Sequence, residues 1–171
     1  MTAPTPRHLQ LPGIRLKVLE AGAGPPVLLL HGFPDSGDLW REVAPRLVAA
    51  GHRVIAPDLR GFGDSEAPAG PRHYAIDRVL ADMLALLAQL GVGGPVRVMG
   101  HDWGAVIAWC LAMFHPERVA ANVVLSVGHP REYAWAELEQ KRKGAYTLAW
   151  QLPGIAEARL SRNDWAGLRH W

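Results

Sequence analysis

The fold is decided by the segment Val96-Arg97-Val98-Met99-Gly100-His101-Asp102-Trp103-Gly104-Ala105. Its first residues suit a buried strand, its centre is a turn bracketed by Gly100 and Gly104, and an apolar run that suits a helix follows. Glycines are needed at such a turn because its apex residue is strained and the incoming strand lies close to the outgoing helix. The pattern is Gly-x-Ser-x-Gly with Asp102 in the place of serine.

The turn predicts that the side chain of Asp102 points out of the sheet as a nucleophile. At a helix N-terminus, the positive end of the helix dipole favours the ionised carboxylate, which is the form that a nucleophile needs. A lone Asp before a helix is more often an N-cap, which accepts hydrogen bonds from the first helical turn. The two flanking glycines and the preceding strand favour the nucleophile over the N-cap.

A second motif joins the buried run Leu28-Leu29-Leu30 to the turn His31-Gly32-Phe33-Pro34. In a fold with such a nucleophile turn, the loop after this strand supplies one backbone N–H of an oxyanion hole, and the residue after the nucleophile supplies the other. Phe33 and Trp103 occupy these two positions. The residues expected to shape the site around them are His31, Gly32, Pro34, Gly100, His101 and Gly104.

Short β-like runs alternate with longer helical patterns, which is typical of an α/β protein with a mostly parallel sheet and helices on both faces. The pattern predicts six strands. The first two form an antiparallel hairpin, His8–Leu11 with Ile14–Glu20, and the other four are buried inner strands at Val27–Leu30, Arg53–Ala56, Val96–Met99 and Asn122–Ser126.

Three helices are expected between these strands. Asp77–Leu90 places apolar residues on one helical face and is ended by Gly91, and Trp103–Phe114 is ended by Pro116. A third helix is expected over Asp38–Ala50 with Pro45 interrupting it. From His129 the alternation gives way to mixed, charged segments, so residues 1–128 are expected to form the sheet-containing part and 129–171 a different one.

Composition excludes several classes of function. A chain of 171 residues with 49% hydrophobic residues can bury one core, and its net charge of +2 is scattered, which disfavours nucleic acid as a partner. Cys110 is the only cysteine and lies in an apolar run, which favours a reducing, cytoplasmic setting. No signal peptide or membrane segment is visible. The eight histidines lack metal-ligand spacing, so no metal site is expected. No cofactor is expected either, because none of the candidate reactions requires one.

Four motifs, in this order and spacing, resemble the epoxide hydrolase branch of the α/β-hydrolase superfamily. They are His31–Pro34, Asp58–Ser65, Gly100–Ala105 and His115–Val119. The resemblance implies that Asp102 attacks an epoxide carbon to form a covalent ester, which water activated by a distant histidine then hydrolyses. It also implies a small apolar epoxide as substrate. Asp58 and Asp64 flank a glycine turn and are expected to make turn hydrogen bonds rather than to catalyse.

The resemblance extends into residues 129–171, which it identifies as the start of a helical cap. The segment Tyr146–Gly154 is similar to the cap segment that carries a ring-opening tyrosine, which makes Tyr146 the candidate acid. By residue type alone, an exposed helical tyrosine is the simpler interpretation. Tyr133 has no motif support, and Tyr74 is expected to pack near a helix start.

The acid and histidine partners in this fold follow the nucleophile on loops after later strands. Asp164 and His170 come in the right order, but they lie close together and no strand precedes either, so we assign them no role. The expectation is a C-terminally truncated chain that lacks the histidine for turnover. Asp102 would be alkylated once by the epoxide, and the ester would not be hydrolysed. A sheet edge would also be exposed.

Three alternatives stay open at this point. A haloalkane dehalogenase-like hydrolase uses the same aspartate attack, and Trp103 suits a halide-binding donor. A serine esterase would need Ser rather than Asp at position 102. The chain could also be a noncatalytic remnant or binding module, for which the missing histidine is the best argument.

Overall fold

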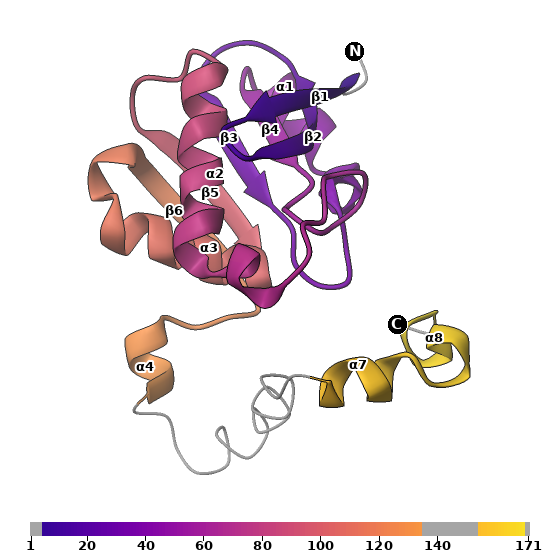
Figure 1. Cartoon of the computed structure of the whole chain (residues 1–171). Helices are drawn as coiled ribbons and strands as arrows, with labels where there is room; N and C mark the ends of the chain where they lie inside the picture. The colour runs from indigo at the N-terminus through magenta and orange to yellow at the C-terminus, as the bar shows by residue number, and fades with distance from the viewer. Residues whose placement is uncertain (1–4, 135–153, 170–171) are drawn as a thin grey trace. The chain divides into compact units, whose positions relative to one another are not determined.

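The computed structural model describes residues 5–134 and 154–169. The chain divides into two compact units, residues 1–128 and 129–171 (Figure 1). The first unit contains the sheet and, among the described residues, three α-helices. The second contains three described helices, and its identity as the start of a cap stays a prediction.

The first unit is built on a six-stranded sheet in the order β1-β2-β4-β3-β5-β6. The strands are β1 Thr5–Leu11, β2 Ile14–Ala21, β3 Pro26–Leu30, β4 Arg53–Pro57, β5 Val96–His101 and β6 Val119–Leu125. The β1–β2 and β2–β4 pairs are antiparallel, whereas β4, β3, β5 and β6 are parallel neighbours. The expected hairpin and mostly parallel sheet are therefore confirmed.

The order of the central strands places a switch point at β3. After β3 the chain runs to β4 on one side, and after β4 it crosses to β5 on the other side of β3. The loops after β3 and β5 therefore leave the sheet next to each other at its carboxyl edge. Open α/β sheets bind their ligands at such a point.

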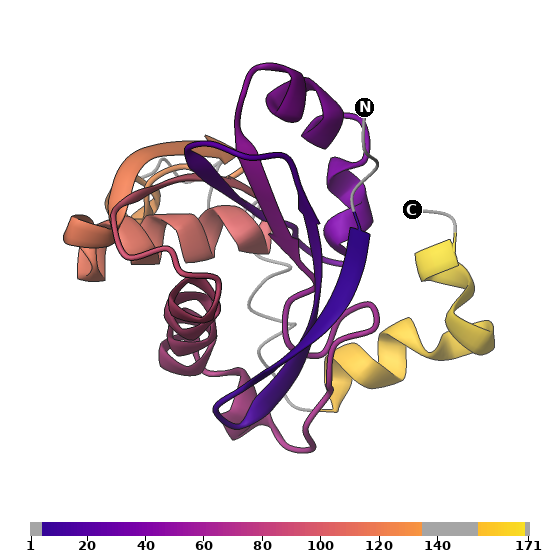
Figure 2. The same ribbon diagram turned by 90° about the horizontal axis from the view of Figure 1, so that it is seen from above.

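Helices cover both faces of the sheet. They are α1 Ala44–Ala49, α2 Ile76–Gln89 and α3 Trp103–Phe114, with single 3₁₀ turns at η1 Gly37–Trp40, η2 Pro71–Tyr74 and η3 Pro116–Arg118. Figure 2 shows α1 on one side of the sheet and α2 and α3 on the other. The larger apolar core lies under α2 and α3, and a smaller one lies under α1 and η1.

The two long helices begin and end close to the residues that the sequence indicates. Gly91 follows α2 with a φ of 72°, and the Val92 N–H donates to the Leu87 carbonyl at 2.8 Å, which ends the helix. The α3 bounds agree with the prediction. Residues on one face of α2 enter the core, because apolar residues recur there every three to four positions.

Two predicted elements are wrong in part. The single helix over Asp38–Ala50 is instead η1 followed by α1, and Pro45 lies in the first turn of α1, where a missing N–H leaves no intrahelical bond unmade. The last strand begins at Val119 and is not a buried inner strand. It lies at the sheet edge, and within the described residues Val123 and Leu125 are 45% and 43% exposed.

The second unit contains α4 Pro130–Ala134, α7 Ile155–Leu160 and α8 Arg162–Arg169. The backbone of α8 is interrupted by Asn163, Asp164 and Trp165, which have positive φ values. Across the part of the chain that the structure describes, no helix has both the length and the apolar character needed to cross a membrane.

Candidate active site

Asp102 sits at the apex of a strained turn between β5 and α3. Its φ of 53° and ψ of −119° lie outside the regions that non-glycine residues normally adopt. The neighbouring glycines allow the tight packing that this turn requires. A Cβ at Gly100 would lie 2.2 Å from the Gly104 carbonyl oxygen, and one at Gly104 would lie 2.0 Å from that of Leu30. The strand and the helix can therefore approach only without side chains at these positions.

The carboxylate of Asp102 is held by the loop after β3 rather than by its own helix. Its Oδ1 accepts a hydrogen bond from the Phe33 backbone N–H at 2.9 Å. The side chain makes no N-cap hydrogen bond to α3, whose first turn bonds only to the Asp102 main-chain carbonyl. The geometry therefore does not support the N-cap interpretation, and it gives Oδ2 no hydrogen-bond partner within the described residues.

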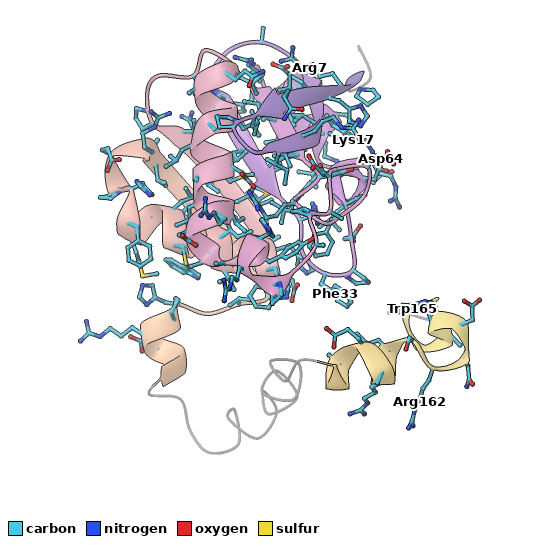
Figure 3. All side chains as sticks on the ribbon, viewed as in Figure 1. Arg7, Lys17, Phe33, Asp64, Arg162 and Trp165 are labelled. Carbon is cyan, nitrogen blue, oxygen red and sulfur yellow. The ribbon has the colours of Figure 1, made fainter. Side chains whose placement is uncertain are left out.

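Gly32 allows the Phe33 N–H to reach this carboxylate. A Cβ at position 32 would lie 2.4 Å from the Asp102 Cβ and 2.5 Å from its Oδ1. The following Phe33–Pro34 peptide bond is cis. Figure 3 labels Phe33 on this loop, at the end of the first unit where the parallel strands terminate.

Trp103 was expected to supply the second oxyanion donor. It is the first residue of α3, so its N–H belongs to the helix N-terminus beside Asp102. In the part of the chain that the structure describes, this N–H makes no hydrogen bond to the carboxylate, and the Trp103 residue is 53% exposed. Its role as a donor stays a prediction.

His31 is buried and committed to backbone hydrogen bonds. Its Nε2 accepts from the Leu59 N–H at 2.9 Å, and Nδ1 faces the Gly32 carbonyl at 2.9 Å. Only the neutral imidazole with a proton on Nδ1 satisfies both partners. Burial lowers the pKa of His31, against the opposing effects of the Gly32 carbonyl, Asp58 and Asp35. The ring is therefore a structural group and not a free base.

Asp58 lies at the centre of a second polar cluster. Its carboxylate is buried and accepts hydrogen bonds from the Gly37 N–H at 2.8 Å and the Asp64 N–H at 3.0 Å. Lys17 Nζ lies 3.4 Å from Asp58 and 3.3 Å from Asp64, and Figure 3 shows Lys17 beside Asp64. Partial burial lowers the pKa of Lys17, but the carboxylates of Asp58, Asp64 and Asp38 outweigh this effect and raise it. Asp58 thus makes the turn hydrogen bonds that the sequence predicts.

One buried ion pair was missed at the level of the sequence. Arg60 Nε and Nη2 donate to the two carboxylate oxygens of Asp82 at 2.7 Å each, and Arg60 Nη1 donates to the His73 carbonyl. Both charged side chains are buried. The signal that could have revealed the pair is an acidic residue on the apolar face of α2, between Leu80 and Met83.

Other predicted residues are not brought to this site. Tyr146 and His170 lie outside the described residues. Asp164 lies in α8 of the second unit, whose position relative to the first is not determined. His101, the last residue of β5, is partly exposed. Among the residues that the structure describes, no group of three His, Cys, Asp or Glu side chains could hold a metal ion.

Comparison with known proteins decides the family. The model of the α/β hydrolase fold matches residues 25–166. The chain belongs to this family. Among its relatives, epoxide hydrolase A of Mycobacterium tuberculosis is 44% identical over 94% of this α/β hydrolase and 52% of its own length. Epoxide hydrolase 1 of Siraitia grosvenorii is 45% identical over 90% of this chain and 50% of its own length.

Solved structures agree. The crystal structure of the epoxide hydrolase VrEH1 from Vigna radiata is 40% identical, with a TM-score of 0.82, and the match covers 95% of this α/β hydrolase and 54% of the other chain. The chain therefore spans about half the length of these relatives. In the fold that they share, the described sheet places Asp102 at its carboxyl edge.

Proposed function

We propose that this α/β hydrolase chain is part of an epoxide hydrolase and that Asp102 is its nucleophile. The observation that carries the proposal is the hydrogen bond from the Phe33 N–H to Asp102 Oδ1 at the strained turn. It orients the carboxylate so that Oδ2 is left to react. The names of the relatives support an epoxide as the substrate class.

In the first step, Asp102 Oδ2 attacks an epoxide carbon. A bond forms between Oδ2 and carbon while the bond from that carbon to the ring oxygen breaks, so the negative charge moves to the departing oxygen. That oxygen then needs a proton, for which Tyr146 is the proposed donor. Asp102 becomes a neutral ester whose carbonyl oxygen, Oδ1, still accepts the hydrogen bond from the Phe33 N–H.

In the second step, water adds to the ester carbonyl carbon. The negative charge that develops on Oδ1 is stabilised by the Phe33 N–H and, in our proposal, by the Trp103 N–H. The bond between the carbonyl carbon and Oδ2 then breaks, so that Oδ2 leaves as part of the diol and takes up a proton, while the oxygen of the water remains in the restored carboxylate. A histidine base would take the proton of the water, and His31 does not suit that task because both of its ring nitrogens are engaged.

The setting of this reaction is also part of the proposal. A small apolar epoxide fits the implied chemistry, and no cofactor is required by either step. The second unit is proposed to begin a helical cap. A cytoplasmic location is supported by Cys110, the single cysteine of the sequence and a free thiol, which suits a reducing compartment.

Intact-mass spectrometry after incubation with styrene oxide tests the proposal. We expect a gain of one styrene oxide mass on the wild-type chain and none on Asp102→Ala. Glu42→Gln is the matched control, because Glu42 is a carboxylate with an 82% exposed side chain that pairs with Arg41 at the surface, and it should be dispensable for adduct formation. Diol formation with Asp102-dependent turnover would equally support the nucleophile and would show that a base is present.

Two other outcomes would contradict the proposal. Halide release from a haloalkane without reaction at the epoxide would assign the chain to dehalogenation, which uses the same attack and for which the exposed Trp103 is suited. A chain that is folded by circular dichroism yet forms neither adduct nor diol would favour a noncatalytic binding module.

A further inference from the structure

We infer that His31 and Asp58 are positioning residues that hold the loop 31–37 against Asp102, so that the Phe33 N–H stays bonded to the nucleophile. Neither side chain is placed to touch the substrate or the reacting atoms. The inference rests on the proposed role of Asp102 and adds to it two residues that act only through Phe33.

The first anchor lies at the start of the loop. His31 Nε2 accepts the Leu59 N–H at 2.9 Å, which ties the residue two positions before Phe33 to the loop after β4. On its other side the ring bonds to the Gly32 carbonyl at 2.9 Å, so it also fixes the peptide that leads to Phe33. Loss of the ring would leave a buried N–H without a partner.

The second anchor lies at the end of the loop. Asp58 Oδ1 accepts the Gly37 N–H at 2.8 Å, and a Cβ at Gly37 would lie 3.1 Å from that oxygen. Asp58 Oδ2 accepts the Asp64 N–H and pairs with Lys17. Both anchors of the loop 31–37 therefore come from one segment, residues 58–65, which is reached from the neighbouring strand β4.

The segment 58–65 is itself firmly held. The Ser65 hydroxyl donates to the Asp58 carbonyl at 2.7 Å, and Arg60 is paired with Asp82 of α2. Phe62 of this segment packs edge-on against His31 and Phe33, with ring centroids 5.3 and 6.3 Å away. The loop that carries the Phe33 N–H is thus fixed at both ends and along its aromatic side.

This arrangement has a consequence for rate. A displacement of about 1 Å in a positioned group can cost about 100-fold in rate. Loosening either anchor should therefore slow the alkylation of Asp102, although the nucleophile and the substrate are unchanged. The same change should weaken the Phe33 to Asp102 hydrogen bond in the absence of any substrate.

Two measurements on the full chain test the inference together. The first is the rate of adduct formation with styrene oxide by intact mass, and the second is the NMR chemical shift of the Phe33 amide proton, compared with that in Asp102→Ala. For His31→Leu and Asp58→Asn we expect alkylation to slow by about 10- to 100-fold, and the Phe33 amide to move toward its position in Asp102→Ala.

Two variants separate positioning from general damage. His31→Gln can still offer an acceptor to the Leu59 N–H and should recover most of the rate and of the amide shift. Leu86→Ala removes a fully buried side chain of α2 that lies in the apolar core, and it should lower stability without moving the Phe33 amide.

The outcomes are distinct. Folded His31→Leu and Asp58→Asn chains with an unmoved Phe33 amide and rates within about twofold of wild type would overturn the inference, as would a His31→Gln chain as slow as His31→Leu. If His31→Leu fails to fold, His31→Gln and Asp58→Asn decide by the same two readings. A wild-type chain that is not alkylated would refute the proposed function, whereas the amide shift would still decide whether the loop is held as inferred.

Discussion

Gly32 is the residue at which the site is least tolerant of change. A methyl group there would overlap the Cβ and Oδ1 of Asp102, so Gly32→Ala should push the Phe33 N–H off the carboxylate. We predict that alkylation by styrene oxide falls by about 100-fold, because the clash displaces the reacting carboxylate and a misplacement of about 1 Å can cost that much. Gly94→Ala is the control, because a Cβ at Gly94 meets nothing within 4 Å. Equal rates in the two variants would contradict the geometry.

Burial of His31 leads us to predict that the free energy of unfolding depends on pH. Its pKa is lowered by burial in the folded chain and is close to 6.5 in the unfolded chain. The unfolded chain therefore takes up a proton that the folded chain resists. The contribution of His31 to the free energy of unfolding is complete above pH 6.5 and is lost as the pH falls toward the folded pKa.

Urea denaturation between pH 5 and 8 measures this effect as the difference between the wild type and His31→Gln. The wild type should lose up to about 1.4 kcal/mol per pH unit relative to the variant on the acid side. Parallel curves for the two chains across this range would mean that His31 does not titrate as the buried, hydrogen-bonded ring should.

The buried ion pair of Asp82 with Arg60 leads us to predict a large effect on stability. Asp82→Asn leaves the Arg60 charge buried without its carboxylate partner, and we expect the free energy of unfolding to fall by about 3–5 kcal/mol. Glu42→Gln is the control, because Glu42 pairs with Arg41 only at the surface and should cost less than about 1 kcal/mol. Chemical denaturation of both variants measures the two losses in free energy of unfolding. Equal losses would mean that Arg60 is solvated and would contradict the buried pair.

The residues that could be predicted from the sequence are those whose partners are near in the chain. The glycines around Asp102 indicate the turn from residues next to it in the chain, and Gly91 indicates the end of α2. The partner of His31 could not be predicted, because Leu59 is 28 residues away and meets it only once β3 and β4 pair. Similarly, the sequence indicates that Asp58 makes turn hydrogen bonds, but not that Gly37 is one of the donors.

Among the elements, α3 connects the turn that carries Asp102 to the core. One face of the helix is buried and the other is exposed near its end, so Leu111→Ala and Met113→Ala should differ in effect. We predict that Leu111→Ala lowers the free energy of unfolding by about 2–5 kcal/mol, and that Met113→Ala changes it by about 0.5 kcal/mol or less. Similar losses for both in urea titrations would contradict the packing of α3.

The elements that the sequence predicts poorly are those without a full set of neighbours. The pattern over Asp38–Ala50 is compatible with one helix, and only the structure shows that the chain turns after Trp40 and restarts at Ala44. The apolar residues of β6 suggest burial, but burial needs covering elements. Within the described residues only one strand, β5, pairs with β6.

At the scale of the molecule, the first unit brings together Asp102 and the Phe33 N–H, which are two of the groups that the proposed first step uses. The strand order places the loops after β3 and β5 side by side, and these loops carry Phe33 and Asp102. The candidate acid Tyr146 belongs to the part of the chain outside the described residues, so its role stays a prediction. The relatives that the chain matches are about twice its length. Turnover of an epoxide is therefore part of the proposed function.

The most direct test of the central claim is to locate the bond that the epoxide forms. The chain is incubated with styrene oxide, digested, and its peptides are sequenced by tandem mass spectrometry. The account predicts a single ester on Asp102, absent when Gly32→Ala is treated for the same short time. An adduct on any other residue, with Asp102 unmodified, would contradict it.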